Sequence, residues 1–239
     1  MGSHVLPAFS VDVENFALVN YLVPAERVLE HLPTNYDLQT FDGDCFVTAT
    51  CFCNGAFRPW MLPGPRLTFD ESTFRTYVTH KGRVGVYFFG RYLSRPSATL
   101  PQRAIARDTY DADFTVASEL TEDGYRAYSC HATSDAGEAS FALTATERPS
   151  AREPFAAGDE MAQFLTYRLH GFFTTSLGFQ GHMPVAHPRM HPWAGELSTA
   201  RLDLFEQLGI LVPDEAQRPH SVLVEPGVRF TLYAPRPLV

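Results

Sequence analysis

The fold is decided by the stretch at residues 71–92, which reads ESTFRTYVTHKGRVGVYFFGRY. Residues 71–79 alternate in the way that a strand does, and residues 83–92 return with β-branched and aromatic side chains. Lys81 and Gly82 lie between the two runs and are suited to a tight turn. The stretch therefore predicts an antiparallel β-hairpin.

Outward from this hairpin, the chain continues to read mostly as strands. Further strands are predicted at residues 36–41, 45–53, 110–119, 125–134, 138–147, 221–225 and 228–233, and strand with loop at 169–193. Short helices are predicted at residues 23–33, 97–107, 159–167 and 202–208. Residues 54–65, rich in Pro and Gly, are predicted to form a loop that carries Trp60.

This succession defines a fold class. It has no alternation of strand and helix and no glycine-rich phosphate loop, which argues against a dinucleotide or nucleoside-triphosphate fold. Many strands with few helices predict a mainly β sandwich or barrel with short helices at its ends. The 239 residues fit one large domain, so a single domain over residues 1–239 is expected.

Composition narrows the function. The formal net charge of −8, with no basic run, argues against a nucleic-acid partner. No stretch approaches the roughly 20 apolar residues of a membrane span, and no secretory signal is visible. The four cysteines form no disulfide framework or zinc pattern, so reduced thiols in a cytoplasmic protein are expected.

The first strand of the hairpin carries unusual chemistry. Alternation places Glu71, Thr73, Arg75 and Tyr77 on one face. Such a face is either exposed to water, with an ion pair of little value, or lines a polar cavity. Taken alone, this segment favours the exposed strand.

Four histidines, His170, His182, His187 and His191, follow within a short region. Prolines interrupt the last two, and no carboxylate lies nearby in the sequence to complete a metal site. We therefore expect no metal and no cofactor. Loop or pocket-rim histidines are the favoured interpretation, and one of them acting as a general acid or base is the alternative.

Several segments resemble a known family. The hairpin residues 69–78 and 82–89 are similar to the signature of the YqjF-like family, a branch of the acetoacetate decarboxylase-like superfamily. The similarity continues, in order, through residues 23–43, 160–168, 191–193 and 225–228, and covers nearly the whole chain.

The resemblance implies a large curved antiparallel sheet, partly closed into a cone-like barrel around a central pocket. It places Glu71 where a decarboxylase glutamate is expected, and it places the Schiff-base lysine around residues 107–110. No lysine is present there, because the chain's single lysine is Lys81. A lysine in an exposed turn stays protonated at neutral pH, so imine chemistry is not expected.

The leading hypothesis is an enzyme that applies non-covalent acid/base chemistry, of cyclase, dehydratase, isomerase or hydrolase type, to a keto or polyketide-like small molecule. The alternatives are a protein that binds such a molecule without chemistry and a structural protein. A homodimer is possible. The expected catalytic residues are Glu71, Arg75, His131 and Tyr110, and the expected substrate-binding residues are Thr73, Tyr77, Tyr87, Trp60 and His191.

Overall fold

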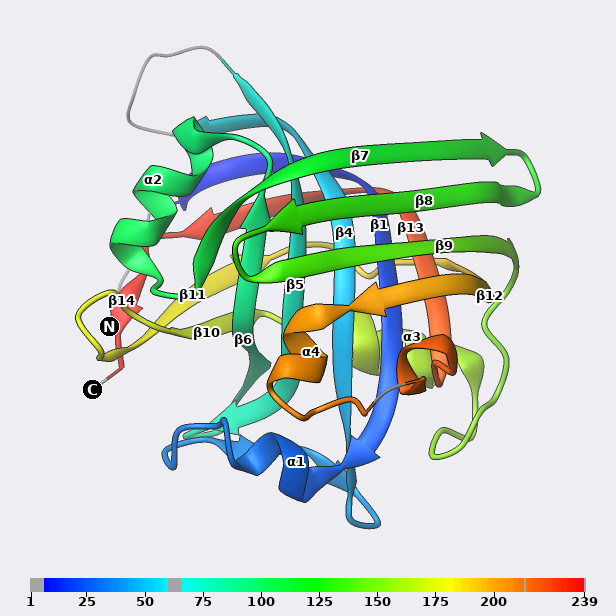
Figure 1. Ribbon diagram of the computed structural model, residues 1–239, viewed down its shortest axis with the longest axis horizontal. Helices are drawn as coiled ribbons and strands as arrows, with labels where there is room; N and C mark the ends of the chain where they lie inside the picture. The colour runs from blue at the N-terminus through cyan, green and yellow to red at the C-terminus, as the bar shows by residue number, and fades with distance from the viewer. Residues whose placement is uncertain (1–6, 60–65, 213, 239) are drawn as a thin grey trace.

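The computed structural model describes residues 7–59, 66–212 and 214–238. Its strands are β1 (Pro7–Pro24), β2 (Asp37–Leu38), β3 (Thr40–Phe41), β4 (Asp44–Pro59), β5 (Leu67–His80), β6 (Arg83–Leu93), β7 (Thr109–Thr121), β8 (Gly124–Ser134), β9 (Gly137–Glu147), β10 (His170–Thr174), β11 (Gln180–Ala186), β12 (Trp193–Leu202), β13 (Ser221–Tyr233) and β14 (Arg236–Pro237). The helices are α1 (Ala25–Leu29), α2 (Pro96–Ile105), α3 (Gly158–Thr166) and α4 (Asp203–Gln207), with a 3-10 turn at Glu215–Gln217. The predicted mainly β fold is confirmed (Figure 1).

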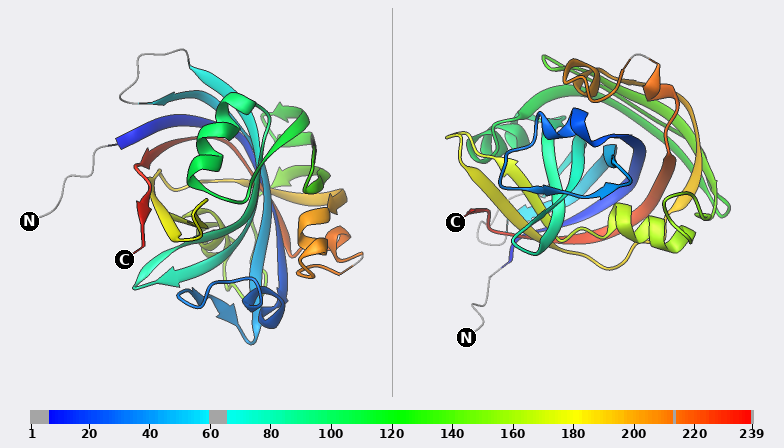
Figure 2. Two further views of the ribbon diagram at one scale, coloured as in Figure 1. Left: turned by 60° about the vertical axis from the view of Figure 1, so that its left-hand side comes forward. Right: turned by 90° about the horizontal axis from the view of Figure 1, so that it is seen from below.

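The strands form one sheet that closes on itself twice. In a larger ring, β6, β7, β8, β9, β12, β13, β1, β4 and β5 pair in that order, and β5 returns to β6. In a smaller ring, β10 and β11 bridge directly from β6 to β13. The two rings therefore share β1, β4, β5, β6 and β13, and the curvature that closes them is visible from below in Figure 2.

The sheet is antiparallel apart from two short parallel pairings among the described strands, β6 with β7 and β6 with β10. In the hairpin of β5 and β6, His80 pairs with Arg83, and the two residues between them have φ angles of 48° and 76°. Positive φ at both central positions matches the twist of the flanking strands. The predicted hairpin is thus confirmed, and Lys81 lies exposed at its turn.

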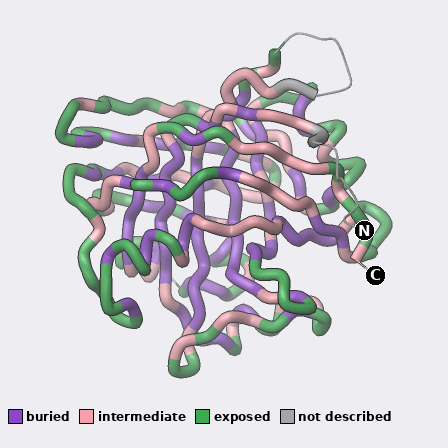
Figure 3. The backbone as a smooth tube through the Cα atoms, turned by 180° about the vertical axis from the view of Figure 1, so that it is seen from behind, coloured by how far each residue is buried: buried purple, intermediate pink, exposed green. Residues whose placement is uncertain are grey.

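The five shared strands are buried on both faces along part of their length. On β5, Phe74 and Val78 point into the larger ring, while Tyr77 belongs to a separate apolar cluster on the other face. Figure 3 shows the buried course of these long strands and the exposed tips of the outer hairpins. Burial on both sides explains why β1 shows no clean alternation and was not predicted.

The helices fill the openings of the rings. Leu204 and Phe205 of α4 are buried in the core of the larger ring, where the Phe205 and Phe74 ring centroids are 5.1 Å apart. Met161 and Leu165 of α3 join the apolar cluster on the side of the smaller ring. Asp159 and Glu160 lie in the first turn of α3, where carboxylates offset the helix dipole.

Several sequence predictions were wrong in their boundaries, and the helix expected at residues 23–33 spans only Ala25–Leu29. The loop expected from residue 54 is strand as far as Pro59, because β4 continues its pairing with β1 and β5 through an irregularity at Asn54–Phe57. The two strands expected at residues 221–233 form the single strand β13, which pairs with β1 on both sides of Pro226. Strand β12 was also not predicted.

Candidate active site

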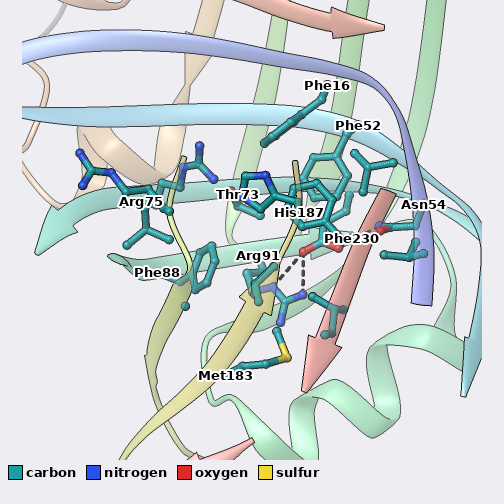
Figure 4. A pocket seen from close by; sticks show the side chains of 18 of the residues that line it. Phe16, Phe52, Asn54, Thr73, Arg75, Phe88, Arg91, Met183, His187 and Phe230 are labelled. Carbon is teal, nitrogen blue, oxygen red and sulfur yellow. Dashed lines mark hydrogen bonds and ion pairs between the residues drawn. The ribbon is translucent and has the colours of Figure 1, made fainter. Parts of the chain in front are cut away.

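The smaller ring encloses a cavity of about 110 Å³. All seven of its strands contribute lining residues, together with the segments that follow α3 and β11. The apolar part of the cavity wall consists of aliphatic side chains and of four phenylalanines, Phe16, Phe52, Phe88 and Phe230 (Figure 4). The polar side chains of the lining are those of Asn54, Glu71, Thr73, Arg75, Arg91, Thr166, Arg168, His170 and His187.

Glu71, on β5, is held by three donors. Its Oε1 accepts hydrogen bonds from Arg91 Nη2 at 2.6 Å and from Arg91 Nε at 2.9 Å. Its Oε2 accepts a third from Asn54 Nδ2 at 2.9 Å. The side chains of Glu71 and Arg91 are 7% and 14% exposed, so this is a nearly buried ion pair in which two nitrogens of Arg91 donate to one carboxylate oxygen. Because both carboxylate oxygens are engaged, Glu71 is positioned to fix Arg91.

Arg75 lies two alternations further along β5 and lacks such a partner. Its Nη2 donates to the Leu165 carbonyl at 3.4 Å, while its buried Nε has no partner among the described residues. Its guanidinium lies 5.6 Å from the centroid of the Phe16 ring. Burial lowers the pKa of Arg75, which is the cost of keeping a cation away from water.

Arg168, immediately after α3, adds a second cation to the same cavity. Its guanidinium stacks on Phe164 at 4.1 Å, and its buried Nε and Nη2 have no partner within the described ranges. Burial lowers the pKa of Arg168 to about 10; Tyr77 opposes this shift and the charge of Arg75 adds to it. Among the described lining residues, Glu71 is the only carboxylate and is already paired with Arg91. The charges of Arg75 and Arg168 are thus not balanced within the cavity.

Two histidines also line the cavity. His187 donates from Nδ1 to the Pro188 carbonyl at 2.8 Å, and its buried Nε2 has no partner in the part of the chain that the structure describes. Its ring lies 4.5 Å from that of Phe230. His170, on β10, has an unpartnered buried Nδ1, and burial lowers its pKa. Within the described ranges, no group of three or more His, Cys, Asp or Glu side chains is arranged to hold a metal ion.

The structure brings together Glu71, Thr73 and Arg75, as alternation along β5 predicts. Tyr77, the fourth residue of that face, lies behind the cavity wall. Its hydroxyl donates to the Leu165 carbonyl at 3.1 Å, and its ring lies 5.0 Å from the Arg168 guanidinium.

Other residues expected at the site lie elsewhere. Tyr87 pairs across the hairpin with Thr76, in unbroken register from the two-residue turn, and this places it in the larger ring. Its hydroxyl shares a hydrogen bond with the Thr174 hydroxyl at 2.9 Å. Tyr110 packs edge-on against Tyr92 in the same core.

The remaining candidates are also remote from the cavity. His131 is exposed on β8, with Nδ1 lying 3.4 Å from Glu138 Oε1. His191 is exposed, lines a separate groove of about 440 Å³ beside α3, and donates its backbone N–H to Glu225 at 2.8 Å. Trp60 lies outside the described residues.

Comparison with known proteins identifies the family. A model of the DUF2071 family, described as an uncharacterized conserved protein, matches residues 11–229, so the chain belongs to this family. The uncharacterized protein YqjF of Bacillus subtilis (strain 168) is 26% identical over 191 residues, which cover 77% of this chain and 74% of that protein. The resemblance expected from the sequence is confirmed.

Solved structures confirm the fold. The enduracididine biosynthesis enzyme MppR, complexed with the condensation product of pyruvate and imidazole 4-carboxaldehyde, superposes with a TM-score of 0.67 at 12% identity, covering 97% of this chain and 89% of that one. The acetoacetate decarboxylase from Legionella pneumophila gives 0.67 at 13% identity, covering 100% of this chain and 90% of that one. No helix in the described ranges has the length and apolar character needed to span a bilayer.

Proposed function

We propose that this chain is a small-molecule enzyme that binds a short keto acid in the smaller ring and acts on it without a covalent imine. The observation that carries the proposal is the pair of buried guanidinium groups, Arg75 and Arg168, whose donors lack an anionic partner among the described residues. A bound carboxylate would supply that partner through charge-assisted hydrogen bonds.

The size of the cavity limits the ligand. An apolar cavity of about 150 Å³ accommodates benzene, and the cavity here measures about 110 Å³. This favours an acid of a few carbons over a polyketide-like compound. The pyruvate-derived ligand of MppR supports a short keto acid by analogy of fold.

The roles follow from the contacts. Arg75 and Arg168 anchor the carboxylate. Arg91, fixed by Glu71, polarises the keto oxygen and stabilises the enolate that forms on it. We assign Glu71 to holding Arg91 rather than to proton transfer, because its oxygens already accept three hydrogen bonds. Reactions that begin by forming an enolate, such as isomerisation or dehydration, fit this arrangement.

Lysine chemistry has no place in this proposal. The chain's single lysine, Lys81, lies exposed at the turn between β5 and β6. Residues 107–110, where the decarboxylase-like scaffold would carry its lysine, contain Arg107 and Asp108 instead. The alternative to an enzyme is a protein that only binds the acid, which the apolar walls would also allow.

Calorimetric titration with pyruvate tests the anchor. We expect Arg75→Met to weaken binding by about 10- to 100-fold, since hydrogen bonds to charged groups contribute about 1.5–3 kcal/mol. The matched control is Arg201→Met, which removes an exposed arginine on β12 that forms an ion pair with Asp203. Equal affinity in wild type and Arg75→Met, or no binding by wild type, would contradict the proposal.

A further inference from the structure

His187 lines the cavity, and the lone pair of one of its ring nitrogens has no hydrogen-bond partner among the described residues. Its Nδ1 lies 2.8 Å from the Pro188 carbonyl oxygen. A carbonyl oxygen can only accept, so Nδ1 carries the proton of the neutral ring. The other nitrogen, Nε2, is then a bare acceptor, and it is buried without a partner within the described ranges.

The surroundings fix this ring and keep it neutral. The Phe230 ring packs against it, tilted by 37°, with the ring centroids 4.5 Å apart, and Tyr167 contacts it edge-on at 5.4 Å. Burial lowers the pKa of His187, and the charge of Arg75 lowers it further, while the Pro188 and Arg168 carbonyls act in the opposite direction. A neutral imidazole in a cavity is a competent proton acceptor near neutral pH.

His187 and Glu71 differ in how many hydrogen bonds their acceptor atoms already receive. Glu71 already accepts three hydrogen bonds, two from Arg91 and one from Asn54, out of about four lone-pair sites on a carboxylate. Nε2 of His187 accepts none among the described residues. Figure 4 shows the His187 ring among the labelled side chains of the cavity.

We propose that His187 is the general base of this cavity and removes a proton from the carbon next to the keto group of the bound acid. The proposal rests on the proposed function, since Arg75 and Arg168 must first hold the carboxylate. No residue of the 187–193 segment other than His187 lines this cavity among the described residues.

The step balances within the cavity. The C–H bond breaks and its proton moves to Nε2, which makes an imidazolium. The electron pair of that bond forms a carbon–carbon double bond, and the carbonyl π pair moves to oxygen, where Arg91 stabilises the enolate. The bound carboxylate and the enolate offset the added positive charge beside Arg75 and Arg168. In heavy water, exchange of the proton on His187 with solvent returns a deuteron to carbon.

Deuterium exchange into pyruvate tests this step without knowledge of the natural substrate. Loss of the methyl signal in heavy water is followed by proton NMR, and pyruvate affinity is measured in parallel by calorimetry. The test variant is His187→Asn, whose side-chain amide retains a donor for the Pro188 carbonyl but lacks Nε2. We expect exchange to fall about 100-fold or more, the usual contribution of a general base, while pyruvate binding is retained.

The control is His31→Gln, which alters a histidine whose Nε2 bonds to the Leu208 carbonyl far from the cavity. It should exchange pyruvate at the wild-type rate. Exchange by His187→Asn at the wild-type rate, or tight binding without exchange by the wild type, overturns the role of His187 and leaves the carboxylate site standing. Failure of the wild type to bind pyruvate overturns the proposed function itself, and with it this inference.

Discussion

The larger and smaller rings share five strands, yet their interiors differ in how polar groups are satisfied. The larger ring buries several tyrosines, and each of Tyr92, Tyr125 and Tyr128 donates its hydroxyl to an oxygen acceptor at 2.8–3.1 Å. In the smaller ring, buried nitrogens of Arg75, Arg168 and His187 lack partners among the described residues.

This difference separates a structural interior from a binding interior. Buried polar groups in folded proteins are nearly always hydrogen-bonded, so a cluster of unsatisfied donors and acceptors needs a cause. In the larger ring the chain supplies every partner of those three tyrosines. In the smaller ring the unsatisfied atoms surround one cavity, and we attribute them to an anionic ligand.

Adjacent residues of β5 provide the sharpest test of this comparison on stability. Phe74 is fully buried in the larger ring against Tyr92 and Phe205. Phe74→Ala should lower the free energy of unfolding by about 3–5 kcal/mol through cavity formation. Arg75→Met should leave that free energy unchanged or raise it by up to about 2 kcal/mol, because it removes a buried, unbalanced charge. Urea unfolding measures both.

The comparison would fail if the two substitutions destabilised the protein equally. Such a result would mean that Arg75 is held as firmly by the protein as Phe74 is, and that no ligand is needed to explain it. Comparing pyruvate affinities of the two variants then separates a loss of structure from a loss of the site.

A smaller effect is expected from the histidines beside the cavity. Burial and the charge of Arg83 lower the pKa of His182 from 6.5 to about 4, and His170, Arg236 and His80 act in the same direction. The unfolded chain therefore takes up this proton more readily than the folded protein. The folded state should lose stability as the pH falls from 6.5 towards 4.

This loss is measured by urea unfolding at several pH values in wild type and His182→Asn. We expect the free energy of unfolding to fall less with decreasing pH in the variant than in the wild type. This difference should be smaller than the change in unfolding free energy expected for Phe74→Ala and smaller than the change in binding free energy expected for Arg75→Met. Parallel declines in the two proteins would show that His182 does not titrate differently on folding.

Local sequence patterns predicted the hairpin and the shared face of Glu71, Thr73 and Arg75 on β5, because a two-residue turn and strict alternation are encoded by neighbouring residues; only the family resemblance implied a pocket. They did not predict the second closure, since β11 reaches β13 and β10 reaches β6 through pairings between distant segments. The bulge at Phe89 of β6 is equally invisible locally, and it brings Arg91 opposite Thr73 on the cavity side of the hairpin.

The same limit explains the site residues that the sequence did not reveal. Arg91 pairs with Thr73 across the hairpin only because of the bulge, since strict alternation on the return strand would place it on the same face as Tyr87. Arg168 and His187 come from segments far along the chain, and only the closure of the smaller ring brings them to Arg75. The histidine-rich region did indicate pocket-rim residues, His187 among them, but no local pattern places His187 or Arg168 in the same cavity as Arg75.

The most direct test of the carboxylate site is a titration of the wild-type protein with pyruvate and with its neutral amide, pyruvamide. The two ligands share size and keto group and differ in charge. We predict that pyruvate binds at least about 10-fold more tightly, because only the acid forms charge-assisted hydrogen bonds with Arg75 and Arg168. Equal affinity for the two, or binding of the amide alone, would contradict the assignment of the unsatisfied arginines to an anionic ligand.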